Sequence, residues 1–423
     1  MRLGILSQYY PPEMGAPQAR LSELAARFVQ RGHEVTVLTA MPNYPSGKIL
    51  PGYGGMFREE NMAGVRVQRC WIFPSNSVDK LSRLASYGSF VASSGVLGAF
   101  TLPKVDYLLT ESPPLFLGIS GYALARLGRA RWIFNVSDLW PESAVRLGVI
   151  GPGTALRLAE RLEAWCYRRA WLVSGQSTGI LADIGARFPR VRTYHLSNGV
   201  DTTMFVPAVT PAGAATRPGD LDGCLVMYAG LHGIAQGLEL VLEAAHRVDG
   251  ETGIRFLLVG DGPEKRGLMS KARDLGLGNV RFMDPIPRQK MPAALQLADI
   301  AVIPLKLDLP GAVPSKLYEA MAVGIPVVLV GEGEPAAIVR ENRAGLVVRP
   351  GDAGGLDAAV RRLAGDRSLR AEYGANGRRA VLDRFDRRHI ANAFITYLED
   401  RLGHPRTTET ATRYASMPES AGD

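Results

Sequence analysis

Short apolar runs of the length of buried strands alternate with amphipathic helical stretches, and this alternation occurs twice along the chain. The first half predicts a helix at 19–31 and strands at 2–7, 34–39, 107–110 and 132–136. The second half predicts helices at 237–248, 265–275 and 316–322 and strands at 225–229, 255–259, 280–283, 300–303 and 326–329. Strands that are joined through helices form parallel sheets, so each half predicts a doubly wound α/β domain.

A turn-rich segment separates the two halves. The turn sequence at 197–201 is followed by prolines at 207, 211 and 218, which interrupt both periodicities. The chain has 423 residues, 46% of them hydrophobic, which is enough for two cores. We therefore predict a first domain at 1–205, a second domain at 206–383, a helix at 384–402 that packs back on the first domain, and a disordered tail at 403–423.

The cysteines and the charge balance limit the functional classes. Cys70, Cys166 and Cys224 lie far apart and have no spacing for a zinc site or a disulfide framework, which favours a reducing, cytoplasmic setting. The first six residues are typical of a buried strand and lack the features of a signal peptide. The net charge of +8 favours anionic partners, either phosphorylated ligands or a lipid surface, whereas the dispersed basic residues argue against nucleic acid.

One apolar stretch, residues 84–102, approaches the length of a transmembrane helix. Serine and glycine residues recur along it, so it is too polar to span a bilayer and predicts a buried or membrane-surface helix. Lys80 and Arg83 precede it, and further basic residues occur elsewhere in the same domain. We predict peripheral, salt-sensitive binding to an anionic inner-membrane surface, and a core helix beside the sheet is the alternative.

Glycine-rich turns follow several of the predicted strands. Gly15 and Ala16 precede the first helix, Gly230 and Gly233 follow the first strand of the second half, and Gly262 follows the next strand. Open α/β sheets bind ligands where strand ends meet helix starts, because free backbone N–H groups and the helix dipole attract phosphate there. The turn after the second of these strands does not complete a GxGxxG pattern, so a dinucleotide dehydrogenase is poorly supported. Structural turns would explain each cluster separately, but together they favour a cleft.

The segment 304–326 is the most informative part of the chain. Pro314 and Ser315 precede a helix, and Glu319 lies one turn inside it. The N–H groups of the helix start would hold phosphates, while a carboxylate one turn later would accept hydrogen bonds from two ribose hydroxyls. The alternative is that Glu319 only complements the helix dipole.

Several motifs resemble retaining family 4 glycosyltransferases, and the resemblance covers residues 1 to about 400. They are Pro-Ser-Lys-Leu-Tyr-Glu-Ala-Met-Ala at 314–322, Gly-Ile-Pro-Val-Val at 324–328, Ser-Asn-Gly-Val-Asp at 197–201 and Gly-Asp-Gly-Pro-Glu at 260–264. The runs at 9–17, 42–48, 111–116 and 137–143 are similar to a bacterial subgroup that builds surface polysaccharides, including N-acetylfucosamine transferases of O-antigen and colanic-acid type pathways. The resemblance implies a GT-B fold, in which two Rossmann-like domains face a cleft, and a nucleotide-sugar donor, with a UDP-linked N-acetylated amino sugar as the expectation.

The resemblance also implies roles for individual residues. Asp138, Lys316 and Glu319 would be catalytic, with Asp138 near the sugar or, alternatively, only capping a helix. Ile286 would flank the base. The full donor-binding set is Gly15, Ala16, Gly230, His232, Gly233, Gln236, Gly262, Ile286, Pro314, Ser315, Lys316, Leu317 and Glu319.

Two departures from the family pattern concern charge. Gly311 stands where the family usually has a glutamate that contacts the donor sugar, and the loop after the first strand of the second domain offers His232 and Gln236 where the family usually has an arginine and a lysine. The positive charge that neutralises the leaving diphosphate is therefore expected from Lys316 or His232.

The reaction implied by the resemblance is sugar transfer with retention to a lipid-linked saccharide. The acceptor hydroxyl attacks on the face that the diphosphate leaves, and the protein orients the substrates and stabilises the departing charge. No cofactor and no metal are expected, because the one Asp-x-Asp, at 220–222, falls in the predicted linker. A sugar-nucleotide 2-epimerase of the same fold and a non-catalytic nucleotide-sugar-binding protein are the alternatives; the former needs acid and base groups flanking the sugar, and the latter is allowed by Gly311.

Overall fold

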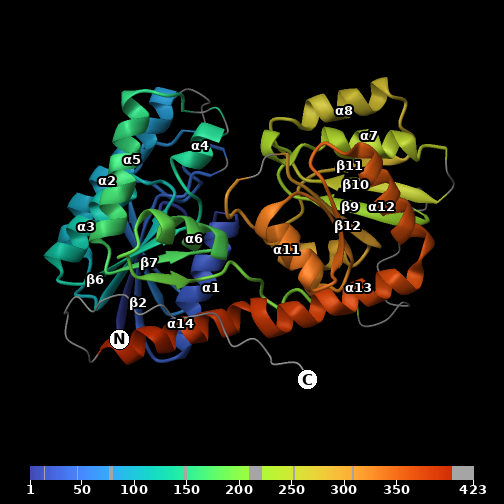
Figure 1. Ribbon diagram of the computed structural model, residues 1–423. Coiled ribbons are helices and arrows are strands. Elements are labelled where there is room, and N and C mark those ends of the chain that lie inside the picture. The colour runs from blue at the N-terminus through green and yellow to red at the C-terminus, as the bar shows by residue number, and fades with distance from the viewer. Residues whose placement is uncertain are drawn as a thin grey trace.

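The computed structural model describes residues 1–402, apart from residues 14, 45, 76–79, 147, 149, 209–221, 251–252 and 307–308. The tail at 403–423, predicted to be disordered, and most of the Asp-x-Asp at 220–222 lie outside the described residues. Two α/β lobes stand side by side, and the last two helices run along the base of both (Figure 1). Each lobe holds its own sheet covered by helices, which confirms the predicted fold class.

The first domain is built on an eight-stranded sheet in the order β3-β4-β2-β1-β5-β6-β7-β8. Neighbouring strands are parallel except β3 and β4, which form an antiparallel pair at one edge. The strands are β1 (Arg2–Leu6), β2 (Glu34–Ala40), β3 (Phe57–Met62), β4 (Val65–Cys70), β5 (Tyr107–Ser112), β6 (Arg131–Val136), β7 (Leu172–Gly175) and β8 (Thr193–His195). The helices are α1 (Ala16–Gln30), α2 (Lys80–Thr101), α3 (Leu117–Leu127), α4 (Glu142–Arg146), α5 (Thr154–Arg169) and α6 (Thr178–Arg187).

The second domain holds a six-stranded parallel sheet in the order β11-β10-β9-β12-β13-β14. Its strands are β9 (Cys224–Ala229), β10 (Ile254–Val259), β11 (Val280–Met283), β12 (Ile300–Pro304), β13 (Val327–Val330) and β14 (Gly345–Val348). Its helices are α7 (Glu239–Arg247), α8 (Lys265–Asp274), α9 (Met291–Leu295), α10 (Ser315–Ala322), α11 (Gly333–Glu341), α12 (Ala353–Gly365) and α13 (Arg367–Ala380), and α14 (Arg387–Leu402) ends the described chain. Every predicted strand is present, with ends that agree within one or two residues.

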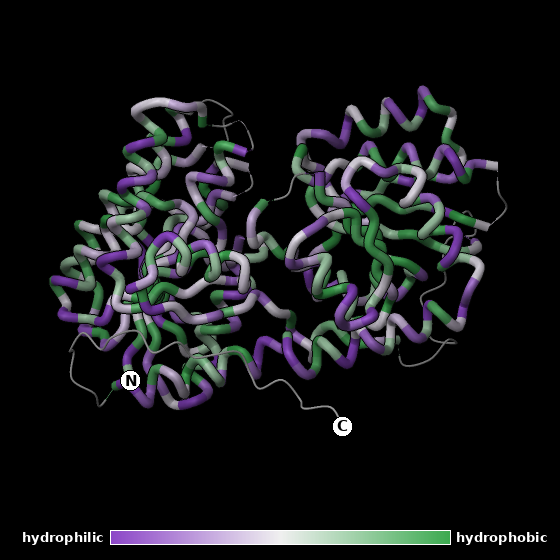
Figure 2. Tube along the Cα trace, viewed as in Figure 1, coloured by the Kyte–Doolittle hydropathy of each residue, from purple (hydrophilic) through white to green (hydrophobic). Residues whose placement is uncertain are grey.

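Both faces of each sheet are buried, which is why the strands read as continuous apolar runs rather than alternating ones. In β1, Ile5 packs on one face of the first sheet and Leu6 on the other. In β9, Met227 and Tyr228 divide between the two faces of the second sheet in the same way. Hydrophobic segments accordingly concentrate inside each lobe, and hydrophilic ones lie along the outer helices (Figure 2).

The chain crosses between the domains at two places. Val200 and Phe205 are fully buried in the core of the second domain, although the sequence analysis assigned them to the first. After α13 the chain returns, and α14 packs on the first domain through residues that include Phe394 and Leu398. The Tyr107 hydroxyl donates a hydrogen bond to the Leu398 carbonyl oxygen at 2.8 Å.

Helix α2 contains the apolar stretch that the sequence analysis singled out. Phe90 is fully buried and packs into the core of the first domain. An exposed apolar stripe runs along its other side, and we call it the α2 stripe: Leu81, Leu84, Ala85, Gly88, Ala92, Val96, Ala99 and Phe100. Spacings of three and four residues place these positions on one side of the helix. Over the part of the chain that the structure describes, no helix is long and apolar enough to cross a membrane.

Candidate functional site

A cavity of about 350 Å³ lies between the two domains. The first domain lines it with residues that follow β1, β5, β6, β7 and β8, and the second domain with residues that follow β9, β12, β13 and β14. The carboxyl ends of both sheets therefore face each other across the cavity, which is the ligand-binding edge of open α/β sheets. Five of the predicted site residues line it: Ala16, Asp138, Gln236, Pro314 and Ser315.

Helix α10 begins at the cavity wall. Its cap residue, Pro314, is extended, and no side chain caps the first turn. The free N–H groups and the positive end of the helix dipole suit an anion at this point. Leu317 differs from its predicted role, because its side chain is fully buried in the core and its N–H donates to the Pro314 carbonyl oxygen at 3.0 Å.

Lys316 places its ammonium beside the glycine turn after β9, and its chain neighbour Ser315 lines the cavity. Nζ of Lys316 donates to the Tyr228 hydroxyl at 2.7 Å and lies 4.2 Å from the centroid of the Tyr228 ring. A Cβ on Gly230 would lie 2.9 Å from Nζ, so glycine leaves room for the ammonium. Removal from water lowers the pKa of Lys316 to about 8, while the Glu319 carboxylate opposes that shift. Lys316 is thus a cation at neutral pH whose charge is poorly compensated.

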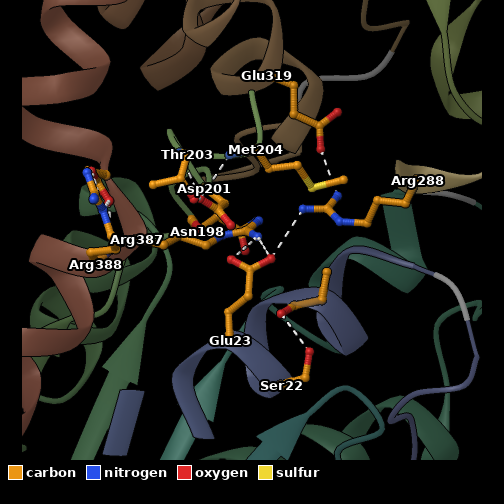
Figure 3. Close-up of polar contacts among 12 residues, drawn as sticks. Ser22, Glu23, Asn198, Asp201, Thr203, Met204, Arg288, Glu319, Arg387 and Arg388 are labelled. Carbon is orange, nitrogen blue, oxygen red and sulfur yellow. Dashed lines mark hydrogen bonds and ion pairs between the residues drawn. The ribbon is translucent and has the colours of Figure 1, made fainter. Parts of the chain in front are cut away.

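Glu319 faces a cation that the sequence analysis did not associate with it. Its Oε1 accepts a hydrogen bond from Nη1 of Arg288 at 3.1 Å. Nη2 of Arg288 lies 3.4 Å from Oε1 of Glu23, which belongs to α1 in the first domain. Figure 3 shows these side chains pointing toward one another across the domain boundary. The predicted ribose ligand is therefore part of an interdomain charge network.

Asp138 follows β6 and lines the cavity. Burial raises the pKa of Asp138, and hydrogen bonds from the Ser143 hydroxyl and the Leu139 amide oppose that shift. Ser143 belongs to the first turn of α4, so its hydrogen bond to Asp138 also stabilises the start of that helix. Both interpretations of Asp138, a cavity carboxyl and a helix-bracing residue, are compatible with this position.

A buried polar network beneath Asp138 was missed by the sequence analysis. Arg20 of α1 donates to Glu111 at 2.5 Å and to Ser137 at 3.0 Å, and Asn135 donates to the other Glu111 oxygen at 2.7 Å. Both charged residues are buried, and removing one of them would leave an uncompensated charge. The network thereby fixes the segment that carries Asp138. Its sequence signal was Glu111 near the end of a buried strand, because a buried glutamate is rare without a partner.

His232 does not supply the positive charge that was expected of it. Its ring is fully buried and packs against the rings of Tyr228 and Phe282, with centroids 5.8 and 6.2 Å away. Burial lowers the pKa of His232, and the charge of Lys265 lowers it further. The imidazole is therefore neutral at pH 7 and lies outside the cavity wall, which leaves Lys316 as the predicted source of charge.

The remaining predicted residues are not among the residues that line the cavity. A Cβ on Gly262 would lie 2.3 Å from the His232 carbonyl oxygen, so this glycine permits two loops to pack. Gly233 precedes the short 3-10 helix, Ile234–Gln236, that brings Gln236 to the wall. Gly15 is the exposed cap residue of α1, next to Ala16. The remaining predicted residue, Ile286, packs against the core of the second domain.

Two segments of the second domain touch the start of α6 in the first domain. Gly311 has a φ of +71°, and a Cβ there would lie 2.5 Å from the amide nitrogen of Ile180. Glu334, in α11, accepts hydrogen bonds from the amides of Thr178 and Gly179 at 3.0 and 2.7 Å. Gly311 thus packs against the first domain so closely that no side chain would fit at this position.

Glu332 is a second carboxylate in the cavity wall that the sequence analysis missed. It precedes α11, and of the described lining residues only Asp138 and Glu332 are acidic, while none is basic. A single glutamate after a strand belongs to no recognisable sequence motif. Glu332 is identified as a wall residue only by the way the two domains pack against each other.

Two family models match the chain, one for each domain. The model described as "Glycosyl transferase 4-like domain" matches residues 15–199, and "Glycosyl transferases group 1" matches residues 223–366. Together they take in the residues on both sides of the cavity. The chain belongs to the GT-B glycosyltransferases.

Similar proteins agree with this family. The glycosyltransferase is 27% identical over 347 residues to the putative colanic acid biosynthesis glycosyl transferase WcaI of Escherichia coli (strain K12), a match that spans 78% of this chain and 84% of that protein. It is 28% identical over 388 residues to a GDP-mannose-dependent alpha-mannosyltransferase of Mycolicibacterium smegmatis, spanning 91% and 93% of the two chains. The structure of Anabaena HepE in complex with UDP and glucose is similar with a TM-score of 0.70 at 19% identity, covering 95% of this chain and all of that one, which shows a shared fold.

Proposed function

We propose that this glycosyltransferase transfers a sugar from a nucleotide diphosphate, with retention, to a lipid-linked saccharide in the synthesis of a bacterial surface polysaccharide. The observation that carries the proposal is the composition of α10 at the interdomain cavity. Its uncapped start at Ser315 and the ammonium of Lys316 suit a diphosphate, and the carboxylate of Glu319 suits the ribose hydroxyls.

The proposed chemistry depends on charge that develops on the leaving group. As the bond between the sugar and the diphosphate breaks, negative charge grows on the phosphate oxygens. Lys316 and the start of α10 stabilise that charge, while the acceptor hydroxyl attacks on the same face of the sugar and gives its proton to the leaving phosphate oxygen. Asp138 and Glu332, both in the cavity wall, are suited to accept hydrogen bonds from sugar hydroxyls.

A UDP-linked N-acetylated amino sugar is the proposed donor. HepE, a structural neighbour, holds UDP and glucose, which supports a uridine nucleotide, whereas the mannosyltransferase relative is named for GDP-mannose. Ile286 is the proposed neighbour of the base. A panel of UDP- and GDP-sugars, read out by thermal shift, separates the two bases.

The proposed acceptor is carried on a lipid at the cytoplasmic face of the inner membrane. The name of the WcaI relative refers to colanic acid, a polysaccharide, which supports an acceptor of that kind. The α2 stripe supports peripheral contact with the membrane, because exposed apolar residues at helical spacing suit the boundary between headgroups and acyl chains. Arg83, exposed on the same helix, suits an anionic surface.

Replacing the proposed ribose ligand tests the donor site. Glu319→Ala should weaken binding of the donor's nucleoside diphosphate by about 2 to 4 kcal/mol, because hydrogen bonds to a charged group contribute about 1.5 to 3 kcal/mol each and are not fully additive. Calorimetry measures the loss, and Glu341→Ala at the exposed end of α11 is the matched control. Binding as tight as that of the unmodified enzyme would refute the ribose assignment.

An assay with radiolabelled donors separates transfer from the alternatives. Incorporation of label into lipid that requires membranes with lipid-linked saccharide supports transfer, a changed sugar without incorporation supports a 2-epimerase, and retained donor supports binding alone. The same assay with excess EDTA tests the proposed independence of metal, and full activity is expected.

A further inference from the structure

Arg288 occupies a place between the proposed ribose site and the first domain. It begins a short 3-10 helix after β11, and its guanidinium lies 5.5 Å from the centroid of the Phe205 ring. One side of the guanidinium donates to Glu319 at 3.1 Å, and the other side reaches Glu23 at 3.4 Å. The planar, rigid donor geometry of arginine allows one side chain to hold two carboxylates in fixed positions.

Glu23 has a stronger partner of its own. Its two oxygens accept hydrogen bonds from Nη1 of Arg387 at 2.9 and 2.8 Å, and the Arg387 side chain is 7% exposed. Arg387 is fixed in turn, because its Nε donates to the Asn198 carbonyl oxygen at 2.7 Å. The Glu23 carboxylate is therefore held in place on the first domain. Arg288 lies between Glu23 and Glu319 and contacts both (Figure 3).

The contact leaves one oxygen of Glu319 open. Arg288 donates to Oε1, and no other described residue donates to the Glu319 carboxylate. The side chain is 14% exposed, so Oε2 is the oxygen available to a ligand hydroxyl. A carboxylate next to a bound diphosphate would otherwise repel it, and the positive charge of Arg288 offsets that repulsion.

We propose that Arg288 is a positioning residue of the donor site, which holds Glu319 in the orientation that accepts the ribose hydroxyls and ties it to the first domain through Glu23. The proposal rests on the proposed function, since it requires that Glu319 binds ribose. The proposal also means that the ribose subsite depends on the first domain as well as on the second. Glu23, on α1, contributes without touching the ligand.

The test compares ligands with and without ribose hydroxyls. UDP and its 2′,3′-dideoxy form, and GDP and its 2′,3′-dideoxy form, are titrated by calorimetry, and the ratio of the two dissociation constants for each base is the ribose increment. For the base that binds, we expect an increment of at least about tenfold in the unmodified enzyme. Arg288→Met should reduce it to less than about threefold, Arg288→Lys should restore part of it, and Glu23→Gln should give an intermediate value.

This ratio distinguishes positioning from a structural role, because a general loss of stability weakens both ligands equally and leaves their ratio unchanged. Arg273→Met, at an exposed position of α8, is the control and should keep the full increment. A full increment in Arg288→Met would overturn the inference while leaving the donor site intact. Failure of both UDP and GDP to bind the unmodified enzyme would instead overturn the proposed function.

Discussion

At the scale of single residues, charge is distributed unevenly around the cavity. The described wall contains two carboxylates and no basic side chain, whereas Lys316, which follows the wall residue Ser315, has the neutral Tyr228 hydroxyl as its hydrogen-bond partner. Its lowered pKa reflects burial that a bound diphosphate would compensate. A buried ammonium whose hydrogen-bond partner is uncharged is suited to bind a phosphate.

The affinity for the nucleoside diphosphate should therefore depend on pH. Lys316 of the free enzyme loses its proton as the pH rises through about 8, and the bound diphosphate raises the pKa of the ammonium. Affinity should be constant between pH 7 and the pKa of the free enzyme and should fall at higher pH, up to about tenfold per unit. Calorimetry from pH 7 to pH 9.5 measures this profile.

Lys316→Met provides the control for that profile. It should bind about 1.5 to 3 kcal/mol more weakly at pH 7, as expected for the loss of a charged hydrogen bond, and its affinity should not change over the same range. A flat profile in the unmodified enzyme would show that the ammonium is not the group that neutralises the diphosphate.

At the scale of elements, the loop before α10 and the start of α11 meet the start of α6 across the domain boundary. Gly311 packs against Ile180, and Glu334 caps α6 through the amides of Thr178 and Gly179. A carboxylate at a helix N-terminus is favoured by the dipole and by the free N–H groups. These contacts fix how α10 and α11 face the first domain, and with them the shape of the cavity.

Gly311→Ala should disturb that contact. The added Cβ would lie 2.5 Å from backbone, so the loop must move away from α6, and the positive φ adds about 1 kcal/mol of strain. We expect transfer activity to fall far more than the melting temperature. Gly351→Ala is the matched control, since its φ of +79° imposes the same strain where a Cβ meets nothing within 4 Å. Equal effects of the two substitutions on activity would show that the contact is unimportant.

At the scale of the whole molecule, one face of the first domain carries an exposed apolar stripe, while the cavity lies between the domains. Helix α2 lies at the outer side of the first lobe, away from the second lobe (Figure 1). The α2 stripe on it includes Phe100, which is 86% exposed. Large exposed apolar residues that line up on one helix typically mark an interaction surface.

Co-sedimentation with vesicles tests the membrane contact. The enzyme should pellet with anionic vesicles at low salt and be released at high salt, because each basic residue near an anionic surface contributes about 1 kcal/mol. Phe100→Ser together with Leu84→Ser should weaken pelleting at low salt, and Arg83→Glu should do so as well. Met269→Ser, at an exposed position of α8 in the second domain, should have no effect. Protein that remains in the supernatant with anionic vesicles at low salt would refute peripheral binding.

Much of the architecture is determined by local sequence. Four strands of the first domain and five of the second were predicted because buried parallel strands are continuous apolar runs, and the start of α10 was located because Pro314 and Ser315 precede a helical pattern. Five strands were missed. The edge strand β3 is polar and exposed at half of its positions, and polar residues interrupt the apolar ones in its partner β4. An edge strand buries little surface and therefore leaves a weak pattern. The other three, β7, β8 and β14, have only three or four residues each.

The sequence by itself determined the two doubly wound domains, the helix that carries Lys316 and Glu319, and the family to which the chain belongs. Tertiary structure alone decided which groups those residues meet. It buried His232, paired Glu319 with Arg288, and brought Glu332 to the cavity wall. Hydrophobic periodicity is set by neighbours within about four residues along the chain, whereas charge partners are chosen by the packing of segments that are distant in sequence. Glu23 and Arg387, which are separated by 364 positions, meet only because α14 returns to the first domain.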